Sequence, residues 1–146
     1  MKTCTPIYGV DDCRLITLDK HHHPNGNLSV VEGDADVPFD IRRVYYIYDV
    51  PGGEDRGGHA HKNLSQLIVS VSGSFDVTLD DGKERRKIVL NRPYMGLLVR
   101  PGIWRELNNF SSGAVTLVLA SELFDEEDYI RNYADFKDFR KRRDGE

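Results

Sequence analysis

Short apolar or alternating segments, each ended by turn residues, follow one another between about residues 12 and 120. The segment 39–50 is a long aromatic and β-branched run, and the sequence Asp80-Asp81-Gly82-Lys83 has the composition of a tight hairpin turn. Many short strands without intervening helices are typical of a β-sandwich or β-barrel. We therefore predict an all-β fold. The other predicted strands are 28–31, 67–71, 75–79, 87–90, 96–99, 104–108 and 115–120.

The pattern changes after Ser121. The acidic run 125–128 supplies a cap and negative charge for a helix N-terminus, and basic residues between 137 and 143 suit a helix C-terminus. Four apolar residues in between fall at helical spacing and are expected to form a buried face: Tyr129, Ile130, Tyr133 and Phe136. The sequence thus predicts a short C-terminal helix over about 124–141, and residues 1–146 are interpreted as a single domain.

Composition narrows the class of protein. A net charge of −4 argues against general nucleic-acid binding, so we assign the basic run near the C-terminus to the helix dipole and to solubility. No apolar run approaches the roughly 20 residues that a membrane helix needs, and the N-terminus lacks the apolar core of a signal peptide. Cys4 and Cys13 fit a reducing compartment without a disulfide. The expectation is a cytoplasmic protein without a membrane partner.

The most informative chemistry is His59-Ala60-His61, which follows the glycine-rich segment 49–58. Alternate residues of a strand share a face, so both imidazoles are expected to point the same way and to serve as acid–base groups. The spacing from Gly53 to Gly73 resembles the first cupin motif, with Gln66 where a carboxylate ligand normally stands.

The second cupin motif normally supplies another histidine after a Pro-Gly turn. Here Pro101-Gly102-Ile103-Trp104 is followed by Arg105. A divalent metal needs three or four N, O or S ligands, and a guanidinium repels it. We therefore predict a cupin that uses neither a metal nor another cofactor. His21-His22-His23 are adjacent rather than alternating, which favours a surface loop over a metal site.

Several polar residues near these motifs are candidates for substrate contact. Arg43 and Tyr45 share one face of segment 39–50, while Tyr46 and Tyr48 share the other, and the sequence does not decide which face points inward. A phenol beside an imidazole can relay a proton or donate to an enolate oxygen.

Three further candidates flank the histidines. Arg56 precedes His59 by three residues and either grips a phosphate in bidentate fashion or remains a solvated loop charge. Trp104 either stacks on a base, lines the pocket or packs in the core. Arg105 is expected near the histidines, where it stabilises an enolate or contacts the substrate.

At the level of whole segments, the chain resembles the nucleotide-sugar 3,4-ketoisomerases of the cupin superfamily over about residues 12–140. The motifs that carry the resemblance are RVYYIY, RGxHAH, PxxW and DYIRNY, together with the stretch NGNLSVVE. The resemblance implies a metal-free cupin jelly-roll barrel that forms a homodimer with exchanged N-terminal strands. It also implies that the ketone of dTDP-4-keto-6-deoxy-D-glucose moves from C4 to C3 through an enediol, without a redox cofactor.

The resemblance also implies residue roles. His61 is our choice for the base at the sugar, His59 for the group that shuttles protons between the sugar oxygens, and Tyr45 for a group near the sugar. Arg56 resembles the arginine that meets the diphosphate in the related 3,5-epimerases, and Glu32 matches a residue of the exchanged strand that approaches thymine in such relatives. Arg105, and less directly Asn25, favour the gluco over the galacto configuration at C4. The product would enter deoxyamino-sugar and polysaccharide biosynthesis.

Three alternatives remain at this point. A nucleotide-sugar 3,5-epimerase shares the fold, but its RGxH element normally continues differently from HAH. A metal-dependent dioxygenase-type cupin is disfavoured by Gln66 and Arg105. A non-catalytic sugar-sensing cupin is disfavoured because the single predicted helix offers no DNA-binding segment.

Overall fold

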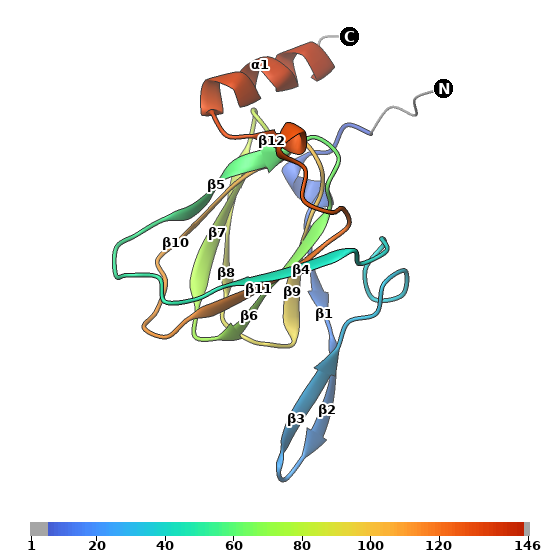
Figure 1. Cartoon of the computed structure of the whole chain (residues 1–146), viewed down its shortest axis with the longest axis vertical. Helices are drawn as coiled ribbons and strands as arrows, with labels where there is room; N and C mark the ends of the chain where they lie inside the picture. Colours follow the sequence, from blue (N-terminus) through green and yellow to red (C-terminus); the bar gives the residue numbers. More distant parts are fainter. Residues whose placement is uncertain (1–5, 145–146) are drawn as a thin grey trace.

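A computed structural model describes residues 6–144 and shows two antiparallel β-sheets facing each other, with a helix at one end (Figure 1). The first sheet has the order β1 (Arg14–Thr17), β9 (Met95–Val99), β6 (Gln66–Ser72), β11 (Val115–Ala120) and β4 (Arg43–Ile47). The second has the order β12 (Tyr129–Ile130), β5 (Arg56–His61), β10 (Trp104–Asn108), β7 (Phe75–Asp80) and β8 (Arg85–Leu90). The predicted all-β fold with a short C-terminal helix, α1 (Tyr133–Asp144), is confirmed.

The main core lies between the two sheets, and it explains why β6 is a continuous apolar run. Ile68 points into this core, whereas its neighbours Leu67 and Val69 point to the opposite face of the sheet. That outer face is covered by Val37 and Phe39, so both faces of β6 are buried. The predicted strand 39–50 is shorter than expected, since only β4 pairs with β11 and the residues before it form this cover.

A two-stranded hairpin, β2 (Asp19–His23) with β3 (Gly26–Val30), projects away from the sheets (Figure 1). The three adjacent histidines therefore belong to a strand, and the expectation of a loop was wrong. All three are exposed, in keeping with a surface position.

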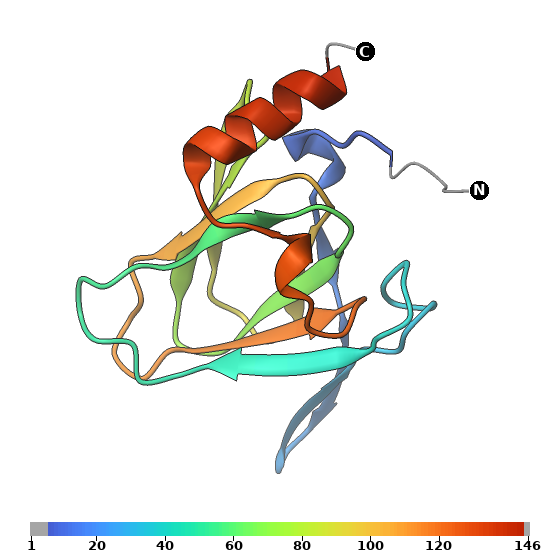
Figure 2. The same ribbon diagram turned by 45° about the horizontal axis from the view of Figure 1, so that its top comes forward.

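The helix begins later than predicted, at Tyr133 rather than near residue 124. Asp125 caps a 3-10 turn, Glu126–Asp128, and Tyr129 and Ile130 then pair with His61 and Ala60 of β5 as strand β12. Figure 2 shows this segment running alongside β5 before it turns into α1. Pairing with β5 satisfies the backbone of residues that local spacing alone assigns to a helix.

Helix α1 packs on the outer face of the second sheet. Its Phe136 is fully buried against Trp104 and Ile130, and Arg140 donates to the backbone oxygens of Tyr8 and Gly102. Cys13 is buried with a free thiol, while Cys4 lies outside the described residues. Among residues 6–144, no helix is long and apolar enough to cross a membrane.

Candidate active site

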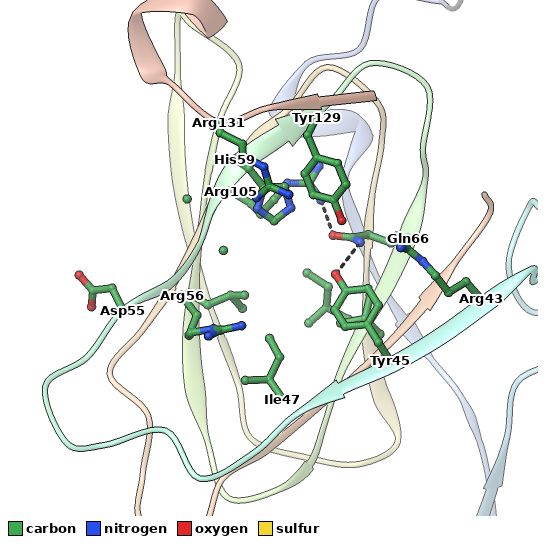
Figure 3. Close-up of a pocket in the computed structure, with 15 residues that line it drawn as sticks. Arg43, Tyr45, Ile47, Asp55, Arg56, His59, Gln66, Arg105, Tyr129 and Arg131 are labelled. Atoms are coloured by element: carbon green, nitrogen blue, oxygen red, sulfur yellow. Dashed lines mark hydrogen bonds between the residues drawn. The ribbon is translucent and has the colours of Figure 1, made fainter. Parts of the chain in front are cut away.

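A cavity of about 510 Å³ opens between the two sheets, and strand β5 brings His59 to its wall (Figure 3). Gly57 makes this placement possible because it takes a positive φ of 76° at an irregularity in the pairing of β5 with β10. A Cβ at Gly57 would lie 2.6 Å from Leu107 Cδ1, so no other residue fits there without displacing a core side chain. The polar and aromatic residues that line the cavity include Arg43, Tyr45, Arg56, His59, Gln66, Arg105, Tyr129 and Arg131.

The two histidines of the HAH motif are in direct contact. His59 Nε2 lies 3.1 Å from His61 Nε2, and the rings meet edge to face. His59 lines the cavity, whereas His61 is fully buried behind it. His61 Nδ1 lies 3.0 Å from Asp128 Oδ2, and the ring of Tyr129 covers both imidazoles. The pair thus forms a continuous line of exchangeable protons from the cavity to a carboxylate.

Both imidazoles are neutral at physiological pH. Burial, with the nearby Arg105 cation and His61, lowers the pKa of His59 from 6.5 to about 2. Burial also lowers the pKa of His61, but its hydrogen bond to Asp128 opposes this effect, and the pKa is about 4. The lone pairs are therefore available to accept protons, and of the two rings His61 is the stronger base.

A second chain of hydrogen bonds crosses the cavity from Arg105 to Tyr45 (Figure 3). Arg105 is fully buried, pairs with His59 across β10 and β5, and donates to Gln66 Oε1 and to the backbone oxygen of Ile103. Gln66 Nε2 in turn donates to the Tyr45 hydroxyl at 3.3 Å. This hydrogen bond occupies a lone pair of the phenol oxygen and not its proton, so the hydroxyl can still donate into the cavity. Burial raises the pKa of Tyr45 and keeps it protonated.

These residues do not fit the metal that cupin folds commonly hold. Gln66 Oε1, at the position of the carboxylate ligand, accepts from the Arg105 guanidinium, which occupies the position of the missing histidine. A cation placed beside the histidines would face this buried positive charge. Within residues 6–144, no group of three or more His, Cys, Asp or Glu side chains is arranged to hold a metal ion.

Further arginines border the cavity. Arg56 and Arg131 are exposed, so they lie where the cavity meets solvent, and Arg131 is held in a two-pronged ion pair with Glu126. Arg43 lies deeper, over the rings of Tyr45 and Phe124, and its buried Nε and Nη2 atoms have no hydrogen-bond partner among residues 6–144. An anionic ligand fits this distribution of positive charge.

Three candidates from the sequence are not at the cavity. Trp104 points to the opposite side of β10 from Arg105 and packs against Tyr133 and Phe136 of α1, because successive residues of a strand alternate. Asn25, at the tip of the β2–β3 hairpin, and Glu32, just after that hairpin, are both exposed and away from the lining residues.

Sequence reasoning missed three residues of the site: Asp128, Tyr129 and Arg131. Local patterns assigned them to a helix N-terminus, and only their pairing with β5 brings them to the histidines. The motif DYIRNY, which includes all three, was the available signal, but nothing in its spacing indicates contact with a segment more than 60 residues earlier.

Known proteins match most of this chain in sequence. The family model described as "FdtA: WxcM-like, C-terminal" matches residues 11–141. The TDP-4-oxo-6-deoxy-alpha-D-glucose-3,4-oxoisomerase of Aneurinibacillus thermoaerophilus is 46% identical over 126 residues, which are 86% of this chain and 91% of the relative.

Two solved structures are similar over most of their length. A mutant of the QdtA 3,4-ketoisomerase of Thermoanaerobacterium thermosaccharolyticum, in complex with TDP-4-keto-6-deoxyglucose, has a TM-score of 0.87 and 44% identity, covering 90% of this chain and 95% of that one. The WlaRB TDP-quinovose 3,4-ketoisomerase of Campylobacter jejuni has a TM-score of 0.83 and 47% identity, covering 87% and 98%.

Proposed function

The chain belongs to the FdtA family of WxcM-like C-terminal domains, and from this premise we propose that it is a 3,4-ketoisomerase of dTDP-4-keto-6-deoxy-D-glucose. The enzyme moves the ketone from C4 to C3 in cytoplasmic deoxysugar biosynthesis. The observation that carries the proposal is the pair of neutral histidines beside the Arg105–Gln66–Tyr45 chain, in a pocket whose residues do not fit a metal. These residues suit proton transfer next to a carbonyl group, and such a transfer needs neither an oxidant nor a reductant.

The histidine pair performs the proton transfers. The C3 proton is acidic because it lies α to the C4 ketone. The sequence favoured His61 as the base at the sugar, but His61 is fully buried, so we assign the contact with this proton to His59 on the cavity wall. His61 is the base in which the proton comes to rest, since its pKa is higher than that of His59. His59 thus shuttles the proton. The isomerisation is complete when a proton has returned to C4 and the proton of the C3 hydroxyl has passed to the C4 oxygen.

The second hydrogen-bonded chain stabilises the enediolate. Tyr45 donates its free hydroxyl proton to a sugar oxygen on which negative charge develops, and Arg105 holds the phenol in place through Gln66. One preorganised donor of this kind contributes about 10²–10³-fold to rate. The positive charge of Arg105 adds to the stabilisation of the anion because it is buried and fixed.

The arginines account for the nucleotide part of the substrate. Arg56 and Arg131 lie at the solvent side of the cavity, where a diphosphate would enter with its sugar directed toward His59. Guanidinium groups bind phosphate oxygens in bidentate fashion. Arg43 has unpartnered donors deeper in the cavity, where it contacts the sugar or the inner phosphate.

The enzyme acts as a homodimer that exchanges its N-terminal strands. Asn25 and Glu32 are away from the cavity of their own chain, and their hairpin projects from the barrel (Figure 1). In an exchanged dimer the same residues reach the cavity of the second copy, where Glu32 meets thymine. A sedimentation mass of twice 16.7 kDa is expected, and a monomer would contradict the exchange.

The configuration at C4 of the product follows the gluco series. Arg105 stands at a position where arginine favours this outcome, and Asn25 stands where the branch that inverts C4 tends to carry an arginine. Support also comes from the Campylobacter relative, a TDP-quinovose 3,4-ketoisomerase, because quinovose is 6-deoxyglucose.

The decisive experiment is an NMR time course with dTDP-4-keto-6-deoxyglucose in deuterated water. We expect a 3-keto product with solvent deuterium at C4, and the coupling of its neighbours reports the gluco or galacto configuration. Deuterium at C3 and C5 with the ketone still at C4 would show a 3,5-epimerase instead. Tight binding without any conversion would indicate a sugar-sensing protein.

A further inference from the structure

We propose that Asp128 is a positioning residue that fixes the ring tautomers of both histidines, so that the unprotonated nitrogen of His59 is the one left for the substrate. The inference rests on the proposed function for its kinetic consequences, but the tautomers themselves are properties of the free protein. Asp128 does not border the cavity, and it acts through His61.

Asp128 is held rigidly against the end of β5. Its Oδ2 atom lies 3.0 Å from His61 Nδ1, its Oδ1 atom accepts from the backbone of Asn63 at 2.7 Å, and its own backbone oxygen accepts from Lys62 at 2.9 Å. The side chain is only 8% exposed. Burial opposes ionisation, but the hydrogen bonds from His61 and the backbone outweigh it and lower the pKa of Asp128. The carboxylate is therefore an anion that can only accept hydrogen bonds.

This anion determines the tautomer of one ring and, through it, that of the next. His61 Nδ1 must carry a proton to bond with Asp128, so Nε2 of a neutral His61 is an acceptor. His59 Nε2, 3.1 Å away, must then carry a proton and donate it. His59 Nδ1 is left with a lone pair, and within residues 6–144 the hydrogen bonds of the His59 ring include none at this atom.

The same arrangement balances the proton transfer. The bond between C3 and its hydrogen breaks, a bond from that hydrogen to His59 Nδ1 forms, and the electron pair remains on the sugar as the enediolate. His59 Nε2 then passes its proton to His61 Nε2. His61 becomes an imidazolium ion next to the Asp128 carboxylate, which stabilises the new charge deep in the protein. The proton of the C3 hydroxyl passes to the C4 oxygen, and the reverse sequence through the two imidazoles returns a proton to C4.

If Asp128 had only a structural role, it would not determine the tautomers of His59 and His61. The two roles can therefore be distinguished in the free protein, without any turnover. The probe is the wild-type protein labelled with ¹⁵N-histidine, assigned by comparison with a His21→Gln, His22→Gln, His23→Gln variant that retains only the two site histidines. At pH 7 we expect His61 protonated at Nδ1 and His59 protonated at Nε2. The opposite tautomers would overturn the proposal, whatever reaction the enzyme catalyses.

The kinetic test uses Asp128→Asn, whose amide can donate to His61 Nδ1 and so reverse both tautomers. We expect kcat to fall at least 100-fold while KM and the Kd for dTDP change less than threefold. The matched control is Glu127→Gln, which removes one charge from the same turn at an exposed position and should leave kcat unchanged. Wild-type tautomers and kcat in Asp128→Asn would refute the positioning role, whereas a wild-type enzyme that forms no 3-keto sugar would refute the proposed function alone.

Discussion

The pair of neighbouring tyrosines on β4 gives the sharpest test of the site. Tyr45 lines the cavity and accepts a hydrogen bond from Gln66, while Tyr46 is on the opposite face of the strand and 62% exposed. Replacing either by Phe removes one hydroxyl and keeps the ring. The two variants therefore differ only in whether the lost hydroxyl faced the substrate.

The magnitudes follow from the contacts of each hydroxyl. In Tyr45→Phe, the loss of one preorganised donor to the enediolate should lower kcat about 10²–10³-fold. The change in stability should be small, about 1 kcal/mol, because within residues 6–144 the hydroxyl loses a single 3.3 Å hydrogen bond, which it accepts from Gln66. In Tyr46→Phe, kcat should remain within twofold of wild type.

The assay is the rate of 3-keto product formation by NMR, with dTDP affinity measured by calorimetry. Binding of dTDP should be unchanged in both variants, because Tyr45 acts at the sugar. Retention of more than a third of wild-type kcat by Tyr45→Phe would refute its role as a donor. An equal loss in Tyr46→Phe would mean that the effect comes from the strand rather than from the hydroxyl.

Two other predictions concern protonation and charge. Because the pKa of His61 falls from 6.5 to about 4 on folding, the unfolded chain binds more protons below pH 6.5. His61 alone should therefore lower the free energy of unfolding by about 2.5 kcal/mol between pH 7.5 and 4.5, and the more strongly lowered pKa of His59 adds a decrease of similar size. In denaturant titrations, the free energy of unfolding of His61→Asn should depend less on pH than that of the wild type, and an unchanged dependence would refute the buried neutral state of His61. The same variant should lose nearly all turnover but still bind dTDP. Arg131→Gln should weaken dTDP binding about tenfold and leave kcat within about threefold of the wild-type value. The control Lys141→Gln, on the exposed side of α1, should change neither quantity. Wild-type affinity for dTDP in Arg131→Gln would exclude a contact with the diphosphate.

The strands of the barrel were predictable because their signals are local. Alternation and turn residues located the segments of β6, β7, β10 and β11 to within one or two residues, and the hairpin turn at Asp80-Asp81-Gly82-Lys83 was located correctly. The strand alternation also fixed His59 and His61 on one side of β5. By contrast, the helix start was wrong because β12 is held by its distant partner β5, and pairing across the chain overrides local spacing.

The same distinction between local signals and long-range contacts applies to the residues of the site. Residue spacing along one strand was enough to predict that the two imidazoles lie together. The resemblance to the cupin motifs then placed an amide and a guanidinium where metal ligands normally stand. The folded chain was needed to show that Tyr45 faces the cavity, that Trp104 packs under the helix, and that Asp128 holds His61. The direction of a side chain depends on which face of its strand is covered, and the partner of a buried polar group depends on segments that only folding brings together.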